Sequence, residues 1–341
     1  MKRALVTGGG GFLGIHLVRE LVAAGIETTS LSRGPHPALE ELGVRHLRAD
    51  LRDAAALRSL FDGHDTVFHT AAKAGVWGRA SEYEAINEMG TRHALEAALA
   101  AGVQRFVHTS SPSVIFDGTD HRNAGRDLPL PKRFLAAYPR SKAAAEQLIL
   151  KANGRPSGSG HLATCALRPH LIFGPGDPHI IPRLLDRARA GRLRIIGSRS
   201  NQVSLTYVEN AALAHVQAAK SLDPSAPHAG LPTFVNQIEP VFLWDWIADL
   251  LEAAGLELPK TAVPAPLAYT GGALLESAWR WLPLPGEPPM TRFVAQQLAS
   301  SHTYDMTPAR RDFGYVERVS LHEANARTFD WVRRGAIEGA P

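Results

Sequence analysis

The sequence predicts an α/β protein built on a doubly wound parallel sheet, with a smaller C-terminal lobe beside it. Three observations lead to this prediction. A glycine-rich turn follows the first apolar run, strand and helix patterns alternate through the first half, and the chain becomes irregular and rich in proline after Pro169. We expect one domain over residues 1–174 and a second over residues 175–341, with later parts of the chain returning to the sheet.

The first half of the chain supplies the strands and helices in turn. Residues 4–6 are an apolar run, and Leu13, Leu17 and Leu21 then share one face of a helix that ends at Gly25. Regular alternation of this kind is typical of βαβ units, which place helices on both faces of a parallel sheet. We expect the further strands at residues 28–32, 44–49, 66–69, 105–109 and 164–167, and the further helices at residues 54–61, 83–101 and 139–153.

Composition excludes several classes of protein. The 341 residues are 45% hydrophobic and 21% charged, which fits a globular chain with a sizeable core and excludes a disordered or collagen-like one. The formal net charge of +4 comes without any run of Lys or Arg, so we expect no nucleic-acid partner. Cys165 is the single cysteine, so no disulfide or cysteine-based metal site is expected, and a cytoplasmic location fits best. We expect no bound metal and no signal peptide.

The glycine-rich turn predicts a binding site for a dinucleotide. Gly8 permits the tight turn, Gly11 lets backbone approach a pyrophosphate, and Gly14 lets the helix pack close to the strand. The free N–H groups of the helix that begins with Phe12 and Leu13 then face the phosphates. With a strand before it and an amphipathic helix after it, the turn indicates a Rossmann-type cofactor domain in the first half of the chain.

The end of the second predicted strand favours NADP(H) as the cofactor. NAD-binding chains usually carry an acidic residue there, about 20 residues after the glycines, to bind the ribose 2′-hydroxyl. Here the strand ends in Ser32 and Arg33, and no acid lies between Glu27 and Glu40. Arg33 can pair with a 2′-phosphate through two N–H donors, and Ser32 can add a hydroxyl. The alternative is an arginine that is merely solvated at the end of a strand.

A tyrosine, a lysine and a serine form the candidate catalytic set. Tyr138 and Lys142 are four residues apart, so they share one face of a helix, and Pro139 suits its first position. The lysine, the helix N-terminus and an oxidised nicotinamide would all favour tyrosinate, which makes Tyr138 a donor or acceptor of the proton on a carbonyl or carbinol oxygen. Ser110 or Ser111, after the fifth strand, can polarise the same oxygen.

Three motifs make the chain similar to the extended short-chain dehydrogenase/reductase family. They are residues 7–14, residues 138–142, and Arg168-Pro169 followed by residues 174–176. The resemblance implies that Ser111 is the catalytic serine and that Pro169 and His170 lie near the nicotinamide carboxamide. It also implies further cofactor contacts: Asp50 and Leu51 at the adenine, and Thr70, Ala71, Ala72 and Lys73 after the fourth strand.

Within that family, residues 109–118, 137–142 and 167–179 resemble one branch. It contains the 3β-hydroxysteroid and sterol-4α-carboxylate 3-dehydrogenases and the bacterial 2-alkyl-3-oxoalkanoate reductases of long-chain olefin biosynthesis, which the sequence resembles most. The resemblance implies NADPH-dependent reduction of a β-keto acid with two long alkyl chains. It also implies a homodimer formed through the helices at 83–101 and 139–153, and other enzymes of the olefin pathway as partners.

Three other functions compete with this interpretation. A sterol or hydroxysteroid dehydrogenase is the nearest enzymatic alternative. Nucleotide-sugar epimerases and dehydratases retain NAD. The dehydratases commonly carry an acidic residue beside the catalytic serine or threonine, whereas in this sequence Ser111 is followed by Pro112. A dinucleotide sensor without catalysis would be expected to lack Tyr138 or Lys142.

The substrate side is less determined by the sequence. The apolar residues 267–282 could line a hydrophobic cavity, lie at a membrane surface from which lipid enters, or form a core helix. They are too few for a membrane span, which needs roughly 18 apolar residues. Cations that could bind a substrate carboxylate are Lys73, Arg79, Arg140 and Arg199. We assign no chemistry to His69, His108 and His170, and we expect Cys165 to be buried.

Overall fold

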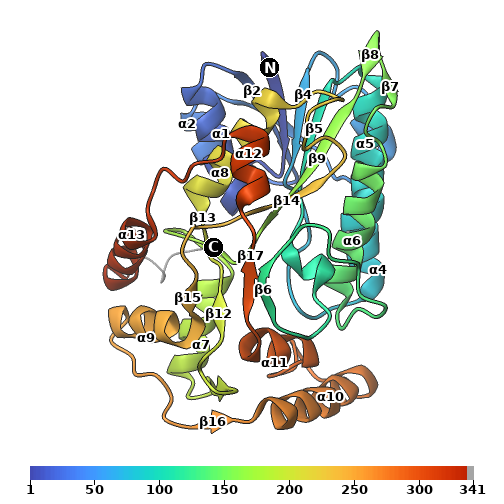
Figure 1. Cartoon of the computed structure of the whole chain (residues 1–341). Helices are drawn as coiled ribbons and strands as arrows, with labels where there is room; N and C mark the ends of the chain where they lie inside the picture. Colours follow the sequence, from blue (N-terminus) through green and yellow to red (C-terminus); the bar gives the residue numbers. More distant parts are fainter. Residues whose placement is uncertain (336–341) are drawn as a thin grey trace.

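Seven parallel strands form the central sheet of the computed structural model, which describes residues 1–335 (Figure 1). Their order is β14-β9-β5-β4-β1-β2-β3, so the chain starts in the middle and winds outward in both directions. This confirms the predicted doubly wound parallel sheet. The strands are β1 (Arg3–Thr7), β2 (Glu27–Ser32), β3 (Arg45–Arg48), β4 (Thr66–His69), β5 (Arg105–Thr109), β9 (Ala163–Pro169) and β14 (Pro232–Val235).

Helices cover both faces of this sheet. On one face α1 (Phe12–Ala23) packs against α8 (Val208–Ser221), and Leu17 and Ala214 are fully buried there. The other face is covered by α3 (Ala54–Leu57), α5 (Gly90–Ala100) and α6 (Ala137–Leu150), which enclose Phe106 and Leu95. Short helices α2 (Pro37–Glu41) and α12 (Thr307–Phe313) and the hairpin β7 (Pro156–Ser157) and β8 (Gly160–His161) complete this part.

A second lobe lies at the carboxyl ends of the strands and has its own core around Trp244 and Phe173 (Figure 1). Its four-stranded sheet has the order β15-β12-β17-β6, with β15 (Val241–Phe242), β12 (Gln202–Val203), β17 (His302–Tyr304) and β6 (His121–Ala124). Two-stranded pairs join β10 (Ile172–Phe173) to β13 (Thr206–Tyr207) and β11 (Ile195–Ile196) to β16 (Ala262–Val263). Its helices are α7 (Ile180–Arg189), α9 (Leu243–Ala253), α10 (Ala265–Trp281), α11 (Arg292–Ala299) and α13 (Leu321–Arg333).

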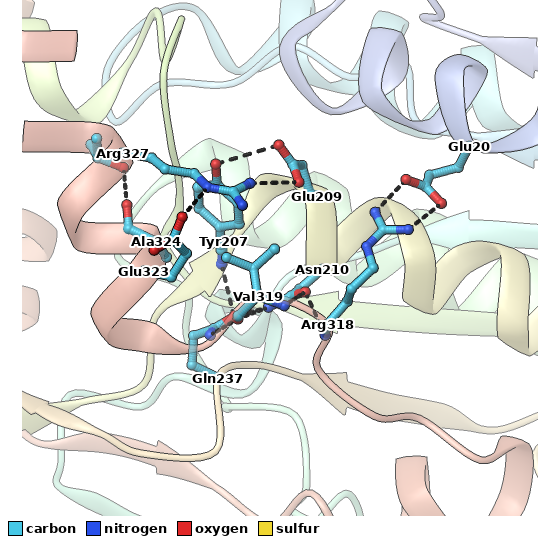
Figure 2. A network of polar contacts seen from close by, with 11 residues as sticks. Glu20, Tyr207, Glu209, Asn210, Gln237, Arg318, Val319, Glu323, Ala324 and Arg327 are labelled. Atoms are coloured by element: carbon cyan, nitrogen blue, oxygen red, sulfur yellow. Dashed lines mark hydrogen bonds and ion pairs between the residues drawn. The ribbon is translucent and has the colours of Figure 1, made fainter. Parts of the chain in front are cut away.

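The chain after residue 174 contributes to both lobes. β14 completes the edge of the large sheet beside β9, and α8 and α12 cover the sheet. Figure 2 shows how the C-terminal segment binds to α8. The Asn210 side-chain oxygen accepts hydrogen bonds from the N–H groups of Arg318 and Val319 at 3.0 and 3.1 Å. Its NH₂ group donates to the Val319 carbonyl at 2.7 Å. Arg318 also pairs with Glu20 of α1 at 2.5 Å. The segment just before α13 (Leu321–Arg333) is thereby held against α8 and α1.

Several predicted helices have different bounds in the structure. The helix expected at 83–101 begins at Ala80 and runs through α4 (Ala80–Tyr83), a π-helical segment η1 (Glu84–Met89) and α5. The π-helical segment brings the buried Asn87 toward the loop after β4, where it binds backbone. The helix expected at 54–61 ends at Leu57, and the following residues form turns. The helix expected from Pro139 is α6, which starts two residues earlier at Ala137. The short α2 was not expected.

Candidate active site

The glycine turn between β1 and α1 has the geometry that a dinucleotide site requires. Gly8 has φ +75°, and a Cβ there would lie 2.8 Å from the backbone of Ala71. A Cβ on Gly14 would lie 2.1 Å from the Gly8 carbonyl oxygen. No side chain caps α1 at Gly11, so the first N–H groups of the helix, including those of Phe12 and Leu13, stay available for an anion. The residues at this turn therefore fit a bound pyrophosphate.

The residues predicted to hold the adenosine end gather after β2 and β3. Ser32 lies 3.4 Å from the His46 ring, and Arg33 is exposed beside Asp50. The Asp50 carboxylate is held by Arg52 at 2.6 Å, which lowers its pKa to about 2. The following Leu51 is buried, and its carbonyl accepts a hydrogen bond from His93 at 2.8 Å.

A histidine that the sequence analysis did not select also lies at the glycine turn. The ring of His36 occupies the space beside Gly10, where a Cβ would come within 2.1 Å of it, and it packs edge-on against His46. Burial and His46 both lower the pKa of His36. No sequence motif marks this residue, because its place depends on the loop that follows β2.

The three candidate catalytic residues meet at the carboxyl end of β5. Ser111 caps the short helix η2 (Pro112–Ile115) and lies close enough to Tyr138 to lower the pKa of its hydroxyl. Lys142 is buried one turn along α6, and its ammonium donates to the Thr109 carbonyl at 2.5 Å and to His108 Nε2 at 3.3 Å. The Ser110 hydroxyl is buried and has no hydrogen-bond partner among residues 1–335.

Burial determines the proton affinities of this set. Burial raises the pKa of Tyr138 above its usual value, and the nearby Ser111 offsets part of the rise. Burial also lowers the pKa of Lys142 to about 8, against the attraction of Glu146. The sequence leads us to expect a tyrosine shifted toward tyrosinate. Burial acts in the opposite direction, and the Lys142 ammonium is directed at Thr109 and His108.

Asn87 is a positioning residue that the sequence analysis missed. Its amide accepts from the Lys73 N–H at 2.6 Å and donates to the Lys73 carbonyl at 3.0 Å and to the Ser141 hydroxyl at 2.9 Å. Ser141 in turn donates to the Tyr138 carbonyl at 2.9 Å. Asn87 therefore joins the predicted cofactor loop, Thr70 to Lys73, to the first turn of α6. The sequence signal that could have identified it is a polar asparagine within a predicted helix.

Two histidines beneath the site are held neutral. His69 lies between the hydroxyls of Thr7 at 2.7 Å and Thr91 at 2.9 Å, and burial lowers its pKa to about 3. Thr91 donates its own hydrogen to the Asn87 carbonyl, so the Nε2 atom of His69 carries the proton. His108 stacks on His69 with ring centroids 5.4 Å apart. Both rings are buried near Lys142.

The end of β9 adds Pro169 and His170. The His170 ring binds the Ser204 carbonyl at 2.7 Å through Nδ1, and burial lowers its pKa to about 4. Just before them, Arg168 forms a buried two-point ion pair with Glu146 of α6, at 2.6 and 2.8 Å. This pair fixes α6, which carries Tyr138 and Lys142, to the sheet.

Three of the four cations predicted for a substrate carboxylate are already paired. Lys73 contacts Glu82 at 3.1 Å, Arg140 contacts Glu84 at 3.3 Å, and Arg199 contacts Asp245 at 3.0 Å. Arg79 is exposed, and Ala72 lies exposed at the cofactor loop. Lys73 also lies over the Tyr83 ring, with its ammonium 5.3 Å from the centroid.

Helix α10 is not the core helix that was one expectation for residues 267–282. Its buried residues are Ala268, Gly272 and Glu276, while Leu274 is 70% and Trp281 86% exposed. Glu276, which interrupts the apolar sequence, pairs with Arg292 at 2.7 Å. In the part of the chain that the structure describes, no helix is long and apolar enough to cross a membrane. Cys165 is fully buried, as predicted.

Sequence comparison assigns the family. The sequence model of the 3-beta hydroxysteroid dehydrogenase/isomerase family matches residues 5–265. This range includes the glycine turn, Ser111, Tyr138 and Lys142. The chain belongs to this family. As a member of the 3-beta hydroxysteroid dehydrogenase/isomerase family it is an oxidoreductase that acts on a keto or hydroxyl group. The family and the glycine turn together assign it a nicotinamide dinucleotide as cofactor.

Two bacterial relatives and one solved structure are similar over nearly the whole chain. A 2-alkyl-3-oxoalkanoate reductase of Stenotrophomonas maltophilia is 45% identical, over 95% of this chain and 98% of the relative. One from Shewanella oneidensis is 42% identical, over 96% and 85%. MoeE5 in complex with UDP-glucose and NAD is 28% identical, with a TM-score of 0.73 over 98% of this chain and 99% of that one.

Proposed function

We propose that the protein uses NADPH to reduce a 2-alkyl-3-oxoalkanoic acid to the 2-alkyl-3-hydroxy acid. The placement of Ser111 near Tyr138, one helical turn from Lys142, carries the chemistry of this proposal. The substrate is proposed from the two relatives of 45% and 42% identity, which are named as reductases of such acids. The homodimer stays a prediction. A dimer formed through the helices at 83–101 and 139–153 requires these helices to lie side by side, and α6 packs beside η1 and α5.

In the proposed mechanism Tyr138 is the acid. When bound, NADPH supplies the hydride that reduces the carbonyl carbon. Tyr138 gives its hydroxyl proton to the carbonyl oxygen, and Ser111 donates a hydrogen bond to the same oxygen as negative charge develops there. The positive charge of Lys142 stabilises the tyrosinate that remains until it regains a proton from solvent. The raised pKa of Tyr138 keeps its proton in place at neutral pH, which suits reduction.

The proposed cofactor site follows the edge of the sheet. Gly8, Gly11 and the first turn of α1 would hold the pyrophosphate, and Ser32 and Arg33 the 2′-phosphate. The remaining proposed contacts are Asp50 and Leu51 at the adenine, Thr70 to Lys73 along the middle, and Pro169, His170, Tyr138 and Lys142 at the nicotinamide end.

We expect Arg33→Ala to lower the affinity for NADPH about 10- to 150-fold, because a hydrogen bond to a charged group contributes about 1.5–3 kcal/mol. The affinity for NADH should stay within about threefold, since NADH carries no 2′-phosphate. Titration of protein fluorescence with each cofactor measures both affinities. Arg58→Ala, which removes the exposed arginine at the end of α3, is the control. An equal loss for NADPH and NADH would contradict the role of Arg33.

The substrate is tested by oxidation, because β-keto acids decarboxylate too readily for a clean assay. We expect reduction of NADP by the protein with a 2-alkyl-3-hydroxyalkanoic acid, and little reduction with a 3β-hydroxysteroid or with NAD. The family description, which names hydroxysteroid dehydrogenases, makes the steroid the second candidate substrate. Turnover of the steroid alone, with NAD, would overturn both the substrate and the cofactor proposal.

A further inference from the structure

His108 gives Lys142 a hydrogen-bond partner to which the sequence analysis assigned no chemistry. It lies near the end of β5 and is fully buried, and its Nε2 atom is 3.3 Å from the Lys142 ammonium. The ammonium also donates to the carbonyl of Thr109, the next residue of the strand, at 2.5 Å. β5 therefore supplies acceptors for two of the three N–H groups of Lys142.

This contact determines which nitrogen of His108 carries the proton. An ammonium group can only donate, so Nε2 accepts and the hydrogen of the neutral ring lies on Nδ1. Burial and the charge of Lys142 hold the pKa of His108 well below its usual value, which keeps the ring neutral. The Nδ1 atom has no hydrogen-bond partner among residues 1–335. Within these residues the ring makes one hydrogen bond, the one with Lys142.

The neighbouring His69 fixes the His108 ring in this orientation. The two rings are stacked, with their planes 23° apart and their centroids separated by 5.4 Å. His69 itself is held between the hydroxyls of Thr7 and Thr91, at 2.7 and 2.9 Å. Its proton lies on Nε2, so it has the opposite tautomer to His108. The acceptor of Lys142 is therefore held in place by β1, β4 and α5 as well as by β5.

The charged groups near Lys142 leave its ammonium dependent on these acceptors. Glu146, one turn further along α6, attracts the ammonium, but its carboxylate already binds Arg168 at 2.6 and 2.8 Å. Burial lowers the pKa of Lys142 to about 8, so the charged form is favoured only about tenfold at pH 7. The loss of one acceptor is therefore enough to change the charge of this lysine near neutral pH.

Three further titratable groups face this pair, and all are uncharged at neutral pH. His69 lies on β4 and His215 on α8, and burial lowers their pKa to about 3 and about 4. Tyr138 precedes Lys142 on α6, and burial raises its pKa. None of the three adds a charge that could replace the contact with His108.

We infer that His108 is a positioning residue for the reaction, whose Nε2 atom keeps the buried ammonium of Lys142 charged and held against β5. The inference rests on the proposed function, in which the positive charge of Lys142 stabilises the tyrosinate left by Tyr138. A neutral amine would lose that effect, so the contact sets the upper pH limit at which the protein reduces its substrate. His108 acts only through Lys142.

The test measures the pKa of Lys142 directly, by NMR of protein labelled with ¹³C at the lysine ε-carbon, with Lys142→Met to identify the signal. His108→Phe keeps a ring without an acceptor and should lower this pKa by about one to two pH units. His108→Gln supplies an amide oxygen and should restore at least half of the shift. His228→Phe, which removes a buried histidine bonded to Ala218 of α8, is the matched control and should leave the pKa unchanged. An unchanged pKa in His108→Phe would overturn the inference.

A second measurement uses the unchanged protein, so it does not depend on the folding of a variant. ¹⁵N NMR of the histidine rings should show the proton of His108 on Nδ1 and that of the stacked His69 on Nε2. A proton on Nε2 of His108 would leave no acceptor for Lys142 and would overturn the inference.

Both measurements need neither substrate nor cofactor, which keeps the inference separate from the proposed function. If the pKa of Lys142 shifts as expected but the keto acid is not reduced, the proposed reaction is wrong and the role of His108 toward Lys142 stands. In the working enzyme the alkaline limb of kcat should move to lower pH in His108→Phe, together with the pKa of Lys142. A loss of kcat that is equal at every pH would show a merely structural role and overturn the inference.

Discussion

Tyr138→Phe will lower the rate of reduction about 10²- to 10⁴-fold, the range that a positioned proton donor contributes. The change removes one oxygen atom, which lies near Ser111, and leaves the ring that packs against Tyr83. Hydride transfer without a proton for the carbonyl oxygen leaves an alkoxide in a partly buried site, which is why the effect should be large. Stopped-flow oxidation of NADPH with freshly prepared keto acid measures it.

The matched control for this variant is Tyr83→Phe. Tyr83 is a buried tyrosine in contact with the same ring, but its hydroxyl donates to the Trp77 carbonyl rather than facing Ser111. Its loss should change the rate less than tenfold. The affinity of Tyr138→Phe for NADPH should match that of the unchanged protein. A Tyr138→Phe protein that keeps more than a tenth of the rate would show that another group supplies the proton.

Glu146→Gln will destabilise the protein by about 3–5 kcal/mol, the usual consequence of removing one partner of a buried ion pair. Glu146 is fully buried and Arg168 is 3% exposed, so the change leaves a guanidinium group enclosed with an amide in place of its carboxylate. Glutamine has nearly the same shape as glutamate, so little of the effect comes from packing. The free energy of unfolding in urea measures the loss.

Two further variants identify the cause. The double change Arg168→Met and Glu146→Leu removes both charges and should recover most of the lost stability, because neither group is then left unpaired. Arg140→Gln breaks the exposed pair with Glu84 and should cost less than about 1 kcal/mol. If Glu146→Gln costs as little as Arg140→Gln, the buried pair does not hold α6 to the sheet.

The parts of the site that the sequence predicts are those set by local spacing. The glycine turn needs only residues 8–14, and a tyrosine four residues before a lysine shares a helix face whatever surrounds it. The alternation of strands and helices likewise identifies the sheet, since each element buries its own apolar pattern. These features are visible without knowledge of the fold.

The features that the sequence did not predict join distant segments. Asn87 acts on Lys73 and Ser141 because a π-helical segment turns it inward, and the 3.6-residue period gives no sign of that segment. Arg183 and Glu287 are 104 positions apart and meet only when α7 and the segment after α10 pack together. An ion pair of this kind leaves no trace in local periodicity.

The position of β14 also bears on how the protein is synthesised. The first six strands of the large sheet are complete at Pro169, yet the outer strand beside β9 consists of residues 232–235. A nascent chain that has just left the ribosome as far as β9 therefore presents that strand, in which all seven residues are buried in the finished fold, as an open edge. About sixty more residues must be translated before β14 covers this edge, and during that interval the edge is open to pairing with another chain.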